Sequence, residues 1–185
     1  MLISTIRGAG SWEGEPGVSK HGPGTYSVAL NAALGMVAAA QPLDVRHPRL
    51  IELLALWNVA CEGRRMPHPH DLANGLFRPF IDHLLVLEPL EDGRDFAYQR
   101  IGKAIVALAG TDHTGLTTQS LPAAARSAVL PEYRTCYQTA APVHIEQIDV
   151  LFATGQRELL SKLILPLSED GRTVTRLLAG LYPPE

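Results

Sequence analysis

The stretch EDGRDFAYQRIGKAIVALAGTDHTG, residues 91–115, limits the folds open to this chain more than any other segment. It starts with Asp92-Gly93, a pair that favours the tight turn between two antiparallel strands. The alternating segment RDFAYQRIG then predicts a strand, and GKAIVALAG predicts a helix of about two turns that ends at Gly110. Because the strand is followed at once by a short helix, we expect a cavity between the sheet and the helices that cover it.

The clearest helix lies in RHPRLIELLALWNVACEGRR, residues 46–65. Pro48 suits its first turn, and Gly63 suits the position just beyond its last turn. Arg64 and Arg65 fall at the C-terminal end, where the helix dipole is negative and attracts cations. Apolar residues recur at helical spacing and predict one buried stripe, formed by Leu50, Leu53, Leu54, Trp57, Ala60 and Cys61.

A further, longer helix is predicted in LPAAARSAVLPEYRTCYQTAAP, residues 121–142. Pro131 is expected to open a helix whose apolar stripe is formed by Tyr133, Cys136, Tyr137 and Ala140, and Pro142 ends this helix. The remaining segments predict strands joined by turns, the last turn being Asp170-Gly171. They are DHLLVLEPL before the stretch above, and PVHIEQIDVLF, RELLSKLILPLS and TVTRLLAGLY after the longer helix. Strands joined by hairpins are antiparallel, so the chain is expected to form an α+β domain.

Three segments together resemble a known family. They are LWNVACEGRRMPHPHDL, DFAYQRIGKAIVALAGTDHTG and LILPLSEDGRTVTRLLAG, in this order along the chain. They are similar to the single-domain PAS family of proteobacteria, which was long without a known function. The resemblance implies a PAS-like five-stranded antiparallel sheet with helices on one face and a small cavity between them. The PAS-like domain would cover 47–185, and 1–46 would form a flexible tail and an N-terminal helical extension, with the helix at 26–40.

The overall composition narrows the classes of function. A formal net charge of -3 gives no sign of a phosphate-binding surface, so nucleic acid is not an expected partner. The longest apolar run, 26–40, is too short to span a bilayer comfortably, and no secretory signal is recognisable, so no membrane partner and a cytoplasmic location are expected. Cys61 and Cys136 lie far apart and are interpreted as small buried hydrophobic residues.

A pocket of mixed character is expected where the sheet meets the short helices, because small-molecule sites combine apolar walls with a few polar groups. Arg100 falls on the same strand face as Phe96 and Tyr98 by simple alternation. Facing inward it would need a carboxylate partner, while at the sheet edge its charge would reach solvent. The candidate pocket residues are Trp57, Phe96, Tyr98, Arg100, His113, Tyr133 and Tyr137.

The sequence gives less support to a metal site or to a haem site. His68, His70 and Asp71 could be metal ligands, but Pro67 and Pro69 favour an extended loop with solvated histidines. In the family pattern, Asp71 anchors this connection or starts a helix. His113 is a candidate axial ligand for haem, but the helix at 122–140 contains no histidine, so a pocket wall or loop role is favoured and the cofactor is left unknown.

No enzyme activity is predicted. Ser120, Ser127 and Ser161 lie outside any Gly-x-Ser-x-Gly turn, and the acidic residues cluster in turns, where they are solvated. The resemblance implies a stand-alone sensory or regulatory domain, a homodimer that binds a small ligand, a signalling partner protein or both. Two alternatives stay open: a pure interaction module whose core is filled by its own side chains, and a small metal-dependent enzyme built on His68, His70 and Asp71.

Overall fold

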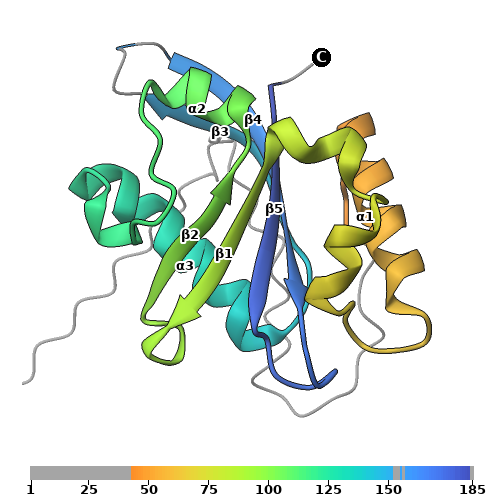
Figure 1. Ribbon diagram of the computed structural model, residues 1–185. Coiled ribbons are helices and arrows are strands. Elements are labelled where there is room, and N and C mark those ends of the chain that lie inside the picture. Colours follow the sequence, from red (N-terminus) through yellow and green to blue (C-terminus); the bar gives the residue numbers. More distant parts are fainter. Residues whose placement is uncertain (1–42, 152–154, 156, 184–185) are drawn as a thin grey trace, which may run out of the picture.

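The computed structural model describes residues 43–151, 155 and 157–183 (Figure 1). The predicted tail and the predicted helix at 26–40 therefore lie outside the described residues. Among the helices of the described part, none has the length and apolar character needed to cross a membrane.

The order of elements agrees with the expected pattern of a helix, two strands, helices and three strands. The α-helices are α1 (Pro48–Cys61), α2 (Lys103–Ala109) and α3 (Ala123–Thr139). The strands are β1 (Leu84–Leu90), β2 (Asp95–Ile101), β3 (Val143–Leu151), β4 (Arg157–Leu167) and β5 (Arg176–Tyr182). Short 3₁₀ helices connect them: η2 (Pro69–Asn74), η3 (Arg78–His83), η4 (Glu91–Gly93) and η5 (Thr118–Ser120).

The five strands form one sheet in the order β2-β1-β5-β4-β3, and every neighbouring pair is antiparallel. The central strand is therefore the last one in the sequence, so the N-terminal and C-terminal hairpins meet along β5. This arrangement confirms the predicted α+β class and the predicted five-stranded antiparallel sheet.

Both faces of the sheet are covered, which corrects the expectation of helices on one face only. Figure 1 shows α3 behind the sheet and the segment η2–η3 in front of it. We call the α3 side the inner face and the other side the outer face. The helix α1 packs on the outer face, where Leu50 and Leu53 lie directly over Gly180 of β5. Its apolar stripe needs a second hydrophobic surface, and the outward-facing leucines of β4 and β5 provide one.

An irregularity between β1 and β2 decides which residues face inward. Leu87 pairs with Tyr98 but the preceding residue, Val86, pairs with Arg100, so Gln99 is an extra residue in β2. Such a bulge reverses the alternation of side chains beyond it. Tyr98 consequently faces inward and Arg100 faces outward. The expectation that Arg100 shares a face with Phe96 and Tyr98 is wrong for this reason.

The longer helix also differs from its expected form. Pro131 lies inside α3, not at its start, because the helix already begins at Ala123. Pro131 has no backbone N–H to donate to the turn before it, a loss that a helix of this length tolerates when its buried face is well packed. Tyr133 and Cys136 supply that buried face, as the sequence predicted.

The loop between β4 and β5 gives a prediction on acid stability. The Asp170 carboxylate accepts hydrogen bonds from the Arg172 and Thr173 amides and the Ser168 hydroxyl, which lower its pKa well below the usual range. Because the folded pKa is lower than the unfolded value, this stabilisation is complete above about pH 4 and is lost as the pH falls further. Asp170→Asn should thus melt below the wild type at neutral pH. The difference in Tm should shrink in acid, and a constant difference would contradict this account.

Candidate ligand cavity

A cavity of about 180 Å³ lies between the inner face of the sheet and the helices α2 and α3. The sheet side contributes Tyr98 and Ile101 of β2 and Lys162 of β4. On the helix side Ile105 of α2 and Val129 of α3 close the space. The predicted cavity below the short helix is therefore present, and its lining is mainly apolar.

Three of the seven predicted pocket residues line this cavity: Tyr98, His113 and Tyr133. Phe96 and Tyr137 lie next to them without lining it. The Phe96 ring meets the Tyr133 ring edge-on at a centroid distance of 5.5 Å and the Tyr137 ring at 6.4 Å. Tyr137 lies against Gly93 so closely that a side chain at this glycine would overlap its ring. Phe96 and Tyr137 thus support the cavity wall from behind.

Trp57 and Arg100 belong to other parts of the molecule. Trp57 lies on α1 at the outer face, and its indole Nε1 donates a hydrogen bond of 2.9 Å to the Pro166 carbonyl. It fastens α1 to β4 and has no place in the cavity. Arg100 faces the outer side of the sheet because of the bulge at Gln99. Sequence alternation could not reveal either placement.

The polar part of the cavity wall centres on two tyrosines. Tyr98 is 5% exposed and Tyr133 is 1% exposed, and their hydroxyl groups interact. Burial raises the pKa of Tyr98 to about 12, although the interaction with Tyr133 partly offsets this rise. Burial likewise raises the pKa of Tyr133 well above its usual value, with further contributions from Tyr98 and Glu132. Both phenols are therefore neutral at physiological pH and can donate or accept hydrogen bonds.

A buried ion pair completes the polar side. The Lys162 ammonium lies 2.5 Å from a Glu132 carboxylate oxygen, and the two side chains are 4% and 9% exposed. Lys162 also lies over the Tyr133 ring, 5.6 Å from its centroid. Neither charged residue was among the sequence candidates. A lysine at an inner position of the strand RELLSKLILPLS was the available signal, since a charge inside a buried strand needs a partner.

His113 lines the cavity from the loop after α2. Its side chain is half-buried, its ring centroid lies 6.4 Å from that of Tyr98, and its Nδ1 lies 3.3 Å from the Ser120 hydroxyl oxygen. The loop after α2 holds it there, and this loop follows β2 closely, because the Gly115 amide donates to the Tyr98 carbonyl. His113 is accordingly a wall residue, as one of the sequence interpretations held.

The cluster His68, His70 and Asp71 has a structural role in the described chain. Asp71 accepts hydrogen bonds from the His68 amide at 2.9 Å and from the Arg64 guanidinium at 3.0 Å. It thereby caps η2 and ties it to the end of α1, in agreement with the anchoring role expected for Asp71. Within the described residues, no three His, Cys, Asp or Glu side chains are grouped in a way that could hold a metal ion.

Comparisons with known proteins concern the fold. No protein-family model and no curated protein matches the sequence. Among solved structures, the chain is similar to the PAS domain of the fruit-fly ELK potassium channel, at a TM-score of 0.46 and 12% identity, covering 61% of this chain and 94% of that one. It is similar to the PAS domain of Bordetella pertussis BvgS, at a TM-score of 0.45 and 14% identity, covering 61% and 87%. A light-oxygen-voltage domain gives a TM-score of 0.43 and 12% identity, covering 63% and 87%.

Proposed function

We propose that this chain is a sensory or regulatory domain of the single-domain PAS type, which binds a small molecule in the inner cavity and has no catalytic role. The observation that supports this function most directly is the cavity itself. It is mainly apolar, with two neutral phenols and the Lys162 ammonium among its polar groups, and small-molecule sites have this composition.

The size of the cavity suggests the class of ligand. A volume of about 180 Å³ is below the usual range for drug-sized ligands, which begins at about 300 Å³, and close to that of cavities that hold one benzene molecule. A single aromatic ring with one hydroxyl or carboxyl group would fit this space. The ring would contact Ile105 and Val129, and its polar group would meet Tyr98, Tyr133 or Lys162.

The proposed mechanism is a shift in population between two positions of α3. The Lys162–Glu132 pair connects β4 of the sheet to α3, and Lys162 lines the cavity. A ligand carboxylate that bound Lys162 would compete with Glu132 and so weaken the connection between helix and sheet. A ligand can shift an equilibrium only through such a difference in affinity for the two states. The changed surface of α3 would then be read by a signalling partner protein or by the second subunit of a homodimer.

Filling the cavity tests this function. Ala125 is a half-buried residue of α3 that lines the cavity, whereas its neighbour Ala124 is exposed on the same helix. Ala125→Phe should weaken the binding of phenol, benzoate or 4-hydroxybenzoate at least about tenfold, and Ala124→Phe should leave it unchanged. Binding is measured by ligand-observed NMR on the full chain.

Two results would contradict the proposal. One is that no member of this single-ring set binds and that protein purified from its host carries no small molecule in native mass spectrometry. The other is that Ala125→Phe binds the probes as the wild type does. Either result would favour the alternative function, an interaction module whose partner contacts do not involve the cavity. Sedimentation of the same variants then reports whether self-association depends on α3.

A further inference from the structure

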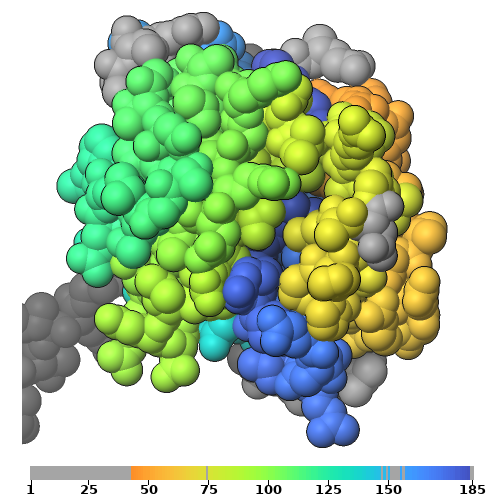
Figure 2. All heavy atoms as spheres, viewed as in Figure 1, coloured from red at the N-terminus to blue at the C-terminus, as the bar shows by residue number. Residues whose placement is uncertain are grey.

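A second and larger hollow lies on the outer face of the sheet. It measures about 540 Å³ and is bounded by η2 and η3 on one side and by β1 and β2 on the other, with Leu178 of β5 in its floor. Figure 2 shows this hollow between the yellow η2–η3 region and the green strands, with blue β5 residues visible below. We call it the outer groove. It is separated from the inner cavity by the sheet itself, because Val86 and Arg100 face outward where Tyr98 faces inward.

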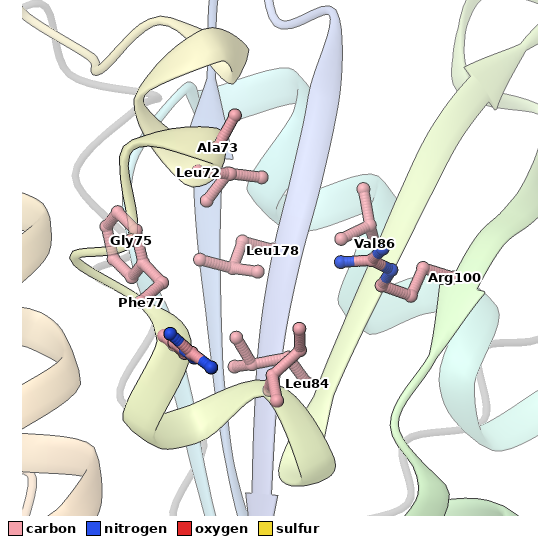
Figure 3. A pocket seen from close by; sticks show the side chains of 10 residues that line it. Leu72, Ala73, Gly75, Phe77, Leu84, Val86, Arg100 and Leu178 are labelled. Atoms are coloured by element: carbon pink, nitrogen blue, oxygen red, sulfur yellow. The ribbon is translucent and has the colours of Figure 1, made fainter.

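The floor and walls of the outer groove are mainly apolar. Figure 3 shows Leu84, Val86 and Leu178 along the sheet, with Leu72 and Phe77 on the opposite wall. Its volume falls within the range of about 300 to 1,000 Å³ that is typical of small-molecule sites. The groove is therefore large enough to bind the apolar part of a small molecule.

Two arginines give the outer groove a positive charge. Arg78 comes from η3 and Arg100 from β2, and none of the described residues that line the groove is acidic. Within the described part of the chain, neither guanidinium makes a hydrogen bond or an ion pair with another residue. The neighbouring carboxylates are already engaged: Asp82 with Lys103 at 3.2 Å, and Glu88 with Arg176 at 3.2 Å.

We propose that the outer groove binds an amphipathic carboxylate, a small molecule with a linear or aromatic apolar body. Arginine is suited to this task because its planar fork can bind a carboxylate through two parallel hydrogen bonds. The carboxylate would bind Arg78 and Arg100, and the apolar body would cover Leu84, Val86 and Leu178. The bulge at Gln99 then has a functional consequence, because it brings Arg100 to the groove side of the sheet.

Charge and volume favour this occupant over a second copy of the chain. An isologous contact would bring the two arginines of one copy close to the equivalent pair of the other, which is unfavourable without added anions. A small carboxylate instead supplies the charge that the groove lacks. This ligand is independent of the one proposed for the inner cavity, so either site can fail its test alone.

Octanoate is the probe for the test, and isothermal titration of the full chain measures its affinity. Arg78→Gln and Arg100→Gln should each weaken binding about fivefold, and the double variant at least about twentyfold. Arg172→Gln, a change of the same kind in the exposed β4–β5 loop, should have no effect. Octan-1-ol, which has the same chain without the charge, should bind less tightly and lose no affinity in the arginine variants.

Steric variants separate the two sites. Ala73 is exposed on η2 and lines the outer groove, so Ala73→Trp should abolish octanoate binding, while Ala125→Phe in the inner cavity should leave it unchanged. The proposal is overturned if octanoate does not bind, or if Ala73→Trp binds it with wild-type affinity. It is also overturned if sedimentation shows that Ala73→Trp dissociates a wild-type dimer, because the groove would then be covered by a second copy.

Discussion

Lys162→Ala and Glu132→Ala are each expected to lower the free energy of unfolding by about 3 to 5 kcal/mol. The two side chains are 4% and 9% exposed and lie 2.5 Å apart, so removing one leaves the other charged and buried without its partner. The cost comes mainly from the desolvated charge that remains, not from the lost attraction. Urea denaturation measures the change.

The double variant Lys162→Met with Glu132→Leu distinguishes this reason from simple loss of packing. Because neither member of the pair remains as an unpaired buried charge, its stability should return to within about 1 kcal/mol of the wild type or exceed it. The exposed pair Lys103–Asp82, with side chains 82% and 44% exposed, is the matched control. Lys103→Ala should cost less than about 1 kcal/mol. Equal losses at the two pairs, or a double variant as unstable as the single ones, would contradict the argument.

The same double variant bears on function. If the Lys162–Glu132 pair transmits ligand binding to α3, the double variant should fold normally and still bind an uncharged probe such as phenol. Its affinity for benzoate should fall to that for phenol, since Lys162, which would attract the carboxylate, has been replaced. If the double variant prefers benzoate over phenol as strongly as the wild type does, Lys162 has no part in the proposed mechanism.

Local signals in the sequence were sufficient to predict the elements and their order. Pro48 and Gly63 bracket α1, Gly110 ends α2 in the left-handed conformation that glycine favours, and the Asp92-Gly93 turn joins β1 to β2. Each signal depends on only a few neighbouring residues. The antiparallel order followed because hairpin turns leave little choice of partner.

The faces of the sheet were harder to predict, because they depend on pairing between strands. Nothing in RDFAYQRIG shows that Gln99 is an extra residue, since its alternation looks regular until β1 is placed beside it. One such residue moves Arg100 from the inner to the outer face. The candidate site was therefore predicted correctly for Tyr98 but not for Arg100, although the two are only two positions apart.

Contacts between residues far apart in the sequence were also not predictable from the sequence. Lys162 and Glu132 are 30 positions apart and lie on a strand and a helix, so no spacing rule connects them. The outer groove forms because the proline-rich connection folds into η2 and η3, and these lie beside β1 and do not cover it. A sequence of prolines and histidines predicts an irregular connection, but not the hollow that it encloses.

Gly102→Ala is expected to destabilise the fold by at least about 2 to 3 kcal/mol. Gly102 is buried where β2 ends and α2 begins, and its backbone φ is -65°, so the reason is steric and not conformational. A Cβ atom there would lie 2.6 Å from the Ile81 carbonyl oxygen and even closer to the Asp82 carbonyl. These are backbone atoms of η3, so the clash can be relieved only by moving η3 and α2 apart.

Gly180→Ala provides the matched comparison, because Gly180 also lacks a positive φ and its new Cβ would lie 2.6 Å from the Leu53 Cδ2 atom. That contact involves the end of a flexible side chain, which can turn away, so a loss of about 1 kcal/mol is expected.

Gly102→Ala should in addition weaken both proposed sites, since η3 carries Ile81 of the outer groove and α2 carries Ile105 of the inner cavity. Titrations with octanoate and phenol on the folded variant measure this effect. Unchanged affinity at both sites would show that α2 and η3 do not fix the walls of either space.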